Sequence, residues 1–285
     1  MRSSGVVSVI KNDLLMVLSV LAATTLLAGP AAANDTSALL YNYEFKGTTG
    51  IVDNSAPAGP VAPLTLSGAW TPVADGVHFS GDTNGNSSVA YGRPASGYTI
   101  NVPATAAMGF GTRIVYDAPA SGTCFADTPN ITQIGRYSAR SAQAKIQLSS
   151  CVGSETSVVI ECRFAGSLTG ADVHPVMSTL PLVNGGVYNI SCVKSPDRKN
   201  NTATITLTVT KLDPVKGNQT VTNTFRVAAL GNMQSEEYIS AGNKYPVPAP
   251  AKNTDQFNGD ITRAIYCDGT PAGVSTCLAT YLPSH

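Results

Sequence analysis

The stretch Leu39-Leu40-Tyr41-Asn42-Tyr43-Glu44-Phe45 sets the pattern from which the fold is predicted. Successive side chains of a β-strand point to opposite faces of its sheet. The alternation therefore places Tyr41, Tyr43 and Phe45 on one face, and Asn42 and Glu44 on the other. We expect this segment to be the first strand of an all-β fold.

The chain that follows repeats short β-branched and aromatic runs, which Gly, Pro and Asn interrupt. Strands recurring in this way, without helical periodicity between them, indicate a two-sheet antiparallel β-sandwich or jelly roll. Residues 232–242 are the one place where a helical turn is expected. The further strands are predicted at 62–66, 76–79, 98–102, 111–116, 130–134, 144–148, 158–164, 187–193, 202–212, 222–228 and 260–267.

Residues 1–33 have the three zones of a secretory signal peptide. Arg2 and Lys11 make a basic start, residues 14–27 are uncharged and mostly apolar, and Ala31-Ala32-Ala33 supplies the small residues of a cleavage site. A membrane anchor needs about 20 apolar residues, which is more than this run provides. We therefore predict cleavage near Ala33 and one sandwich domain at 34–285, in a protein that is secreted or displayed on the cell surface.

Composition argues against several classes of partner. The chain has 18 Lys and Arg against 18 Asp and Glu, so its formal net charge is zero. Such a balance does not favour nucleic acid or an anionic membrane surface. Only 13% of residues are charged, whereas 43% are hydrophobic. This composition is typical of an extracellular β-protein and not of a disordered chain.

Two ends of the chain resemble laminin-G-like domains of the concanavalin-A-like superfamily. Tyr43-Glu44-Phe45, followed by the Gly50-Ile51-Val52-Asp53-Asn54-Ser55 turn, is similar to the opening of those domains. The closing segment, Phe257-Asn258-Gly259-Asp260-Ile261-Thr262-Arg263-Ala264, is similar to their final strand. The segments 64–70, 76–79 and 182–188 resemble strands and a turn between these ends. The resemblance implies two antiparallel sheets in which the first and last strands are adjacent.

For function, the same resemblance implies a binding module more often than an enzyme, with a glycan or an extracellular protein as ligand. A polysaccharide hydrolase or lyase of this fold is the alternative, and a purely structural surface protein is a third. Hydrolases of the superfamily carry closely spaced acids on one strand, and retaining hydrolysis needs two neighbouring carboxyl groups. No such cluster is present. Glu161 and Arg163 are interpreted as a surface ion pair.

Calcium is the one cofactor that the sequence suggests. It requires six to eight oxygen ligands, which usually include carboxylates. Asp53 follows the first strand and Asp260 opens the last, so the two carboxylates are candidate ligands if those strands are neighbours. The alternative is that Asp53 caps a turn and Asp260 is solvated. The three histidines, His78, His174 and His285, have no spacing that suggests zinc.

Sugar binding usually needs exposed aromatic rings. Trp70 is the only tryptophan, and the family pattern places it in the core. Tyrosines near loops or strand ends are better candidates for ligand binding. They are Tyr91, Tyr98, Tyr137 and Tyr245.

Six cysteines follow the leader, which indicates disulfide bonds in an oxidising compartment. They allow 15 pairings. Neighbouring strands favour Cys162–Cys192, and the short spacing of Cys267 and Cys277 favours a local bond. Cys124 and Cys151 then remain as the third pair.

Overall fold

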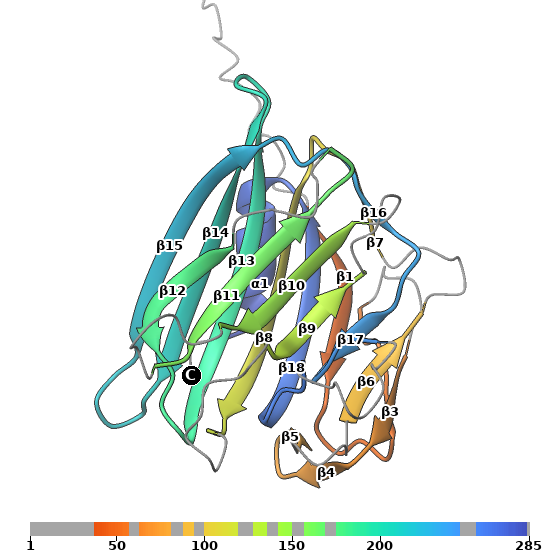
Figure 1. Cartoon of the computed structure of the whole chain (residues 1–285), viewed down its shortest axis with the longest axis vertical. Helices are drawn as coiled ribbons and strands as arrows, with labels where there is room; N and C mark the ends of the chain where they lie inside the picture. Colours follow the sequence, from red (N-terminus) through yellow and green to blue (C-terminus); the bar gives the residue numbers. More distant parts are fainter. Residues whose placement is uncertain are drawn as a thin grey trace, which may run out of the picture. The chain divides into compact units, whose positions relative to one another are not determined.

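The computed structural model describes residues 37–56, 63–80, 88–93, 100–118, 128–135, 142–149, 157–168, 175–245 and 255–283. Asp35–His285 forms one compact unit. It is built on two large antiparallel sheets that face each other, so the predicted β-sandwich is confirmed (Figure 1). The predicted signal peptide, Tyr98, Tyr137, Cys124 and Cys151 lie outside the described residues.

Sheet 1 contains the longest strands and both ends of the fold. Its order is β15 (Gln219–Ala228), β14 (Thr202–Leu212), β13 (Gly186–Asp197), β8 (Ala107–Tyr116), β18 (Gly259–Gly269), β5 (Gly76–Phe79) and β4 (Trp70–Val73). Strand β18 pairs with β8 along one edge, while β5 and β1 (Ser37–Glu44) share its other edge. The first and last strands are therefore adjacent, as the family resemblance implies.

Sheet 2 lies opposite sheet 1. Its order is β12 (Val176–Pro181), β11 (Val159–Ala165), β10 (Gln143–Leu148), β9 (Asn130–Ile134), β17 (Ile239–Ala241), β6 (Ser88–Gly92), β3 (Leu64–Gly68) and β2 (Ile51–Val52). Strands β16 (Met233–Ser235) and β7 (Ile100–Val102) pair separately. The helical turn predicted in 232–242 is wrong, because β16 and β17 occupy this segment. Strand β17 forms ladders with both β6 and β9, and these satisfy its backbone.

Aromatic side chains join the two sheets through the core. Phe110 of β8 meets Phe164 of β11 edge to face, with ring centroids 5.2 Å apart. Tyr266 of β18 stacks on Phe110, and its hydroxyl is hydrogen-bonded to Thr132 of β9. All four side chains are fully buried, and buried apolar area of this kind is the main stabilising contribution to the fold.

A disulfide crosses the sandwich as well. Cys162 of β11 is bonded to Cys192 of β13, with Cα atoms 6.3 Å apart. The two cysteines face each other because both side chains point inward from their sheets, and both are fully buried. This is one of the pairs that the strand pattern favours.

The alternation predicted for the first strand is observed in β1. Tyr41, Tyr43 and Phe45 are buried, and Glu44 is exposed. Asn42 differs from the expectation for a polar face, because it is only 4% exposed. The turn after β2 covers it: Asn42 Nδ2 donates to Ser55 Oγ at 2.8 Å.

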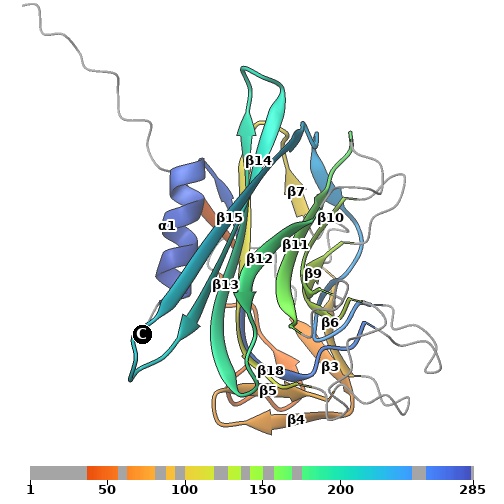
Figure 2. The same cartoon turned by 60° about the vertical axis from the view of Figure 1, so that its left-hand side comes forward.

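One helix, α1 (Pro271–Tyr281), packs on the outer face of sheet 1, on the side away from sheet 2 (Figure 2). The sequence prediction missed it. Thr270 is the N-cap, since its hydroxyl accepts a hydrogen bond from Gly273 N at 3.1 Å, and Pro271 follows at the first helical position, where its missing N–H costs nothing. No described helix has the length and apolarity that a membrane crossing requires.

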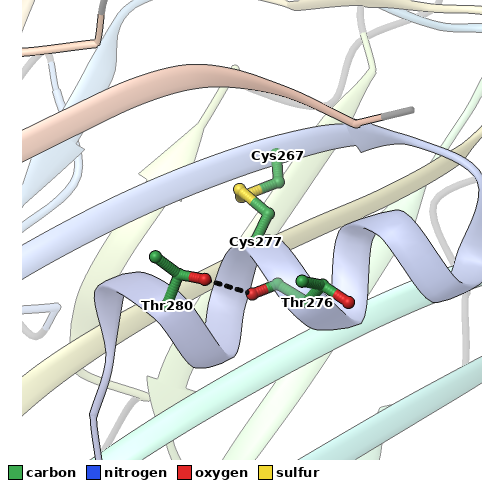
Figure 3. Close-up of a disulfide and its surroundings, with 4 residues drawn as sticks. All are labelled: Cys267, Thr276, Cys277 and Thr280. Carbon is green, nitrogen blue, oxygen red and sulfur yellow. Dashed lines mark hydrogen bonds between the residues drawn. A yellow bond between two sulfur atoms is a disulfide. The ribbon is translucent and has the colours of Figure 1, made fainter. Parts of the chain in front are cut away.

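Two glycines and a disulfide hold α1 against sheet 1. A Cβ at Gly109 would lie 2.5 Å from Val274 Cγ1, and one at Gly111 would lie 2.5 Å from Leu282 Cδ1. Strand β8 therefore lets the helix approach closely only because it has no side chains there. The Cys267–Cys277 bond links β18 to the middle of α1, with Cα atoms 6.4 Å apart (Figure 3). The local bond expected from the short spacing of these cysteines thus holds a helix on its sheet.

Candidate functional site

Three tyrosines gather on the outer face of sheet 2. Tyr91 lies on β6 and points outward, because its neighbour Ala90 is fully buried in the core. Tyr238 directly precedes β17, and Tyr245 follows it after a short turn. We call Tyr91, Tyr238 and Tyr245 the tyrosine cluster. Two of its members were predicted ligand-binding residues, and Tyr238 was not.

A left-handed glycine turns the chain after β17 and returns Tyr245 toward Tyr91. Gly242 has a φ of 80°, which favours glycine over other residues. A Cβ there would lie 2.2 Å from the Phe79 ring. Gly242 N donates to Ile131 O at 2.9 Å, which ties the turn to β9.

Gln256 is the buried residue that fixes this turn to β6. Its Oε1 accepts from Ser88 N at 2.8 Å and from Asn243 Nδ2 at 2.9 Å. Its Nε2 donates to the carbonyls of Gly242 and Phe257, both at 2.9 Å. Because Ser88 begins the strand that carries Tyr91, one neutral side chain positions both halves of the tyrosine cluster.

The rings of the cluster leave one face of Tyr245 uncovered by the other two. Tyr91 and Tyr245 are stacked, with centroids 3.9 Å apart and ring planes 7° apart. Tyr238 is 4.4 Å from Tyr245 and 6.0 Å from Tyr91. These three distances form a nearly right-angled triangle with its corner at Tyr245. Tyr238 therefore lies beside the Tyr245 ring and not over it.

Polar groups accompany the rings. The Arg93 guanidinium lies 5.8 Å from the centroid of Tyr238, within the range of a cation–π interaction. Desolvation raises the pKa of Tyr245, and the neighbouring Tyr91 hydroxyl raises it further. The Tyr245 hydroxyl therefore stays protonated at neutral pH, and it is hydrogen-bonded to Tyr91.

The two predicted calcium ligands occupy different settings. Asp53 is exposed beside β2. Asp260 Oδ1 lies 2.8 Å from His78 Nδ1, and Asp117 Oδ2 lies 3.9 Å from the same nitrogen. Over the part of the chain that the structure describes, no three His, Cys, Asp or Glu side chains are grouped so as to hold a metal. Calcium binding therefore stays a prediction. The link between His78 and Asp260 joins strands far apart in sequence, which no spacing signal reveals.

Two expectations about single side chains need correction. Glu161 and Arg163 do form an ion pair, but Glu161 is only 3% exposed and also accepts from Gln147 Nε2 at 2.9 Å. The pair is thus buried at its carboxylate end and partly exposed at its guanidinium end, and it is not a solvated surface contact. Trp70 was expected in the core, whereas β4 is an edge strand and leaves the indole partly exposed.

Comparisons with known proteins identify no family. No protein-family model matches the sequence, and no curated protein matches it. Similar solved structures include the binding domain of Paraclostridial Mosquitocidal Protein 1, with 10% identity, a TM-score of 0.48, and 86% of this chain aligned to 52% of that one. The binding domain of botulinum neurotoxin serotype G has 7% identity and a TM-score of 0.49, over 85% of this chain and 50% of that one.

Basic winged bean lectin with Tn-antigen has 11% identity and a TM-score of 0.40, over 83% of this chain and 100% of the lectin. The chain therefore spans about half the length of the two toxin domains. At these scores the similarities carry no argument about ligand or activity, so the function has to be argued from the residues of this chain.

Proposed function

We propose that this protein is a secreted carbohydrate-binding module whose tyrosine cluster receives a sugar ring. The observation that carries the proposal is the Tyr245 ring, which is stacked on Tyr91 through one face and leaves its other face clear of both neighbouring tyrosines. The C–H face of a pyranose ring is apolar and flat. It is complementary to an aromatic face, which carries partial negative charge.

Rigidity supports this role for the cluster. The Gln256 side chain is hydrogen-bonded to Ser88 at the start of β6 and to Gly242 and Asn243 in the turn that carries Tyr245, which fixes the two relative to each other. A ring that is held in place before binding loses little conformational entropy when a ligand docks, which favours affinity. The cluster is therefore better suited to a ligand than three independently mobile tyrosines would be.

Polar neighbours supply hydrogen bonds to sugar hydroxyls. The Arg93 guanidinium is exposed beside Tyr238 and is a donor, and the Tyr245 hydroxyl, which is hydrogen-bonded to Tyr91, is an acceptor. A few polar groups around an aromatic surface are typical of small-molecule sites, where they give orientation and specificity. The disulfides suit the extracellular setting in which such modules meet glycans.

A glycan array probed with the wild-type protein and with Tyr245→Ala tests the proposal. We expect the wild type to bind a set of glycans, and Tyr245→Ala to bind them at least about tenfold more weakly, because the stacking surface is lost. Tyr245→Phe should retain most of the binding, since the ring remains. Running the array with calcium and with a chelator also tests the calcium prediction.

Phe225→Ala is the matched control, because Phe225 is 42% exposed on β15 of sheet 1, outside the tyrosine cluster. This variant should bind as the wild type does. Thermal unfolding of each variant checks that the fold is intact. If the wild type binds no glycan, or if Tyr245→Ala binds as well as the wild type, the proposal is wrong.

A further inference from the structure

A cleft on the outer face of sheet 1 has an unbalanced positive charge. It has a volume of about 500 Å³, and its charged lining consists of Lys46, Arg113 and Arg263 against Glu44 and Asp75. We call it the arginine cleft. Cavities of this size are common as sites for small ligands. What this cleft binds depends on which of its cations lacks a partner.

Two of the three cations are already paired. Lys46 Nζ lies 3.0 Å from Asp75 Oδ1, and Arg263 forms an ion pair with Glu44. Arg113 has no ion-pair or hydrogen-bond partner for its guanidinium among the residues that the structure describes. Arg113 and Arg263 stand directly opposite each other on β8 and β18. Like charges in that position repel, so an anion beside Arg113 would be stabilising.

The carbonyl groups at the end of α1, which line the same cleft as Arg113, are bonded to other side chains. Arg263 Nη1 donates to Tyr281 O at 2.6 Å. On the other side, Asn189 Nδ2 donates to Leu282 O at 3.3 Å and to Pro283 O at 2.8 Å. Asn189 is the residue opposite Arg113 on β13. The end of α1 and the residues after it are thus held by hydrogen bonds on both sides of Arg113. The carbonyl groups of this segment accept these bonds from Arg263 and Asn189, and not from Arg113.

We propose that the arginine cleft binds the carboxylate of an acidic saccharide, a uronic acid residue, through Arg113. A guanidinium donates two parallel hydrogen bonds to a planar carboxylate, which adds geometric specificity to the charge attraction. The cleft offers apolar surface beside this group, from Val115 and Val187 on the sheet and from Tyr281 at the end of α1. That surface suits the ring to which the carboxylate is attached.

This site is independent of the tyrosine cluster. The cluster lies on the outer face of sheet 2, whereas the arginine cleft lies on the outer face of sheet 1, and the core separates them. The two sites also differ in chemistry, because one offers an aromatic face and the other an unpaired cation. Either site can therefore be lost without loss of the other.

Isothermal titration with an oligogalacturonate and with its methyl ester tests the proposal. The ester keeps the sugar chain but replaces each carboxylate by an uncharged group with one added methyl, so we expect the acid to bind and the ester to bind at least about tenfold more weakly. Arg113→Ala should weaken binding of the acid by about tenfold or more, and Arg113→Lys by less. Arg226→Ala is the matched control, because Arg226 lies on the same sheet but is paired with Asp197 at 2.9 Å.

A second variant changes affinity in the opposite direction. Glu44→Gln removes the carboxylate that neutralises Arg263, so it should raise the affinity for the acid. Arg113→Ala should also leave the unfolding midpoint unchanged or raise it, because it removes the repulsion between the two arginines. The proposal fails if the acid does not bind at millimolar concentration, if acid and ester bind equally, or if Arg113→Ala has no effect on binding.

Discussion

The two outer faces of the sandwich carry candidate sites that are built from different kinds of group. On sheet 2, three tyrosines cover the surface, Gln256 holds the backbone, and Arg93 beside Tyr238 is the charged neighbour. On sheet 1, a disulfide-linked helix covers the strands, and charged side chains line the cleft near its end. Binding of a neutral glycan at the tyrosine cluster should depend little on salt, whereas the arginine cleft should lose affinity for an anion as ionic strength rises.

The difference also shows how each site depends on the rest of the chain. The tyrosine cluster depends on hydrogen bonds within sheet 2 and its turns. The arginine cleft depends on α1, because Tyr281 and Leu282 form part of its wall. Changes in the helix should therefore affect one face only, and changes at Gln256 the other.

The largest effect is expected for Lys194. Its side chain points from sheet 1 into the core, whereas that of Arg113 points outward into the cleft. The Lys194 side chain is 1% exposed, and its Nζ has no hydrogen-bond partner in the described part of the chain. Burial lowers its pKa from 10.5 to about 8. Between these two pH values the unfolded chain binds a proton that the folded chain has released, so the free energy of unfolding should rise with pH across this window.

Lys194→Met should remove that rise and increase the free energy of unfolding at pH 7 by about 3 kcal/mol. Chemical denaturation at pH 7, 8 and 9 measures both effects, below the pH at which the buried tyrosines ionise in the unfolded chain and lower the stability. Arg113→Ala, by contrast, should change stability little, because its guanidinium faces a solvent-accessible cleft. A stability that stays flat with pH in the wild type would show that Lys194 is paired.

The double variant Cys267→Ala, Cys277→Ala should have the second largest effect on stability. Losing a bond across a short loop should lower the free energy of unfolding by about 2–3 kcal/mol. Because α1 then loosens from sheet 1, uronate binding at the arginine cleft should weaken while glycan binding at the tyrosine cluster is retained. Chemical denaturation, titration with oligogalacturonate and the glycan array test these expectations. Equal losses of affinity at the two sites would show that the two faces do not bind independently.

Gln256→Ala tests the other face, because it disturbs sheet 2 and leaves α1 in place. It removes the partners of Ser88 N and of the Gly242 carbonyl, and leaving buried groups unsatisfied should cost about 2 kcal/mol. Here the tyrosine cluster should lose glycan affinity and the arginine cleft should keep its own. Near-ultraviolet circular dichroism of the tyrosines gives an additional readout of ring packing.

Thr270→Ala is expected to have the smallest effect. It removes the N-cap of α1 and should cost about 1 kcal/mol. The disulfide keeps the helix on the sheet, so uronate affinity should fall by no more than about twofold. A loss as large as that of the cysteine double variant would mean that the cap, and not the disulfide, holds the helix in place.

Sequence patterns predicted the parts of this structure that depend on local alternation. The buried Tyr41, Tyr43 and Phe45 follow from a two-residue period, and the long strands follow from runs of β-branched residues. Helix α1 was missed because its sequence is rich in small and polar residues, and only three of its apolar side chains are buried: Val274, Cys277 and Leu278. Its start signal, Thr270-Pro271, also fits a turn.

The candidate sites depend on pairings that no local pattern contains. Tyr91 and Tyr245 meet because β6 pairs with β17 and Gly242 reverses the chain, which also brings in Tyr238. Arg113 stands opposite Arg263 only because of the register of β8 with β18, which includes a bulge. Such contacts between distant residues arise from the tertiary fold, so composition and spacing do not reveal them.

A titration followed by nuclear magnetic resonance shows whether the two outer faces bind their ligands separately. Arg113 Nε–H and the ring protons of Tyr245 report on the two sites within one sample. A neutral glycan from the array should shift only the Tyr245 signals, and oligogalacturonate should shift the Arg113 signal at lower concentration than any Tyr245 signal. If either ligand shifts both signals with one affinity, the two faces do not bind separately.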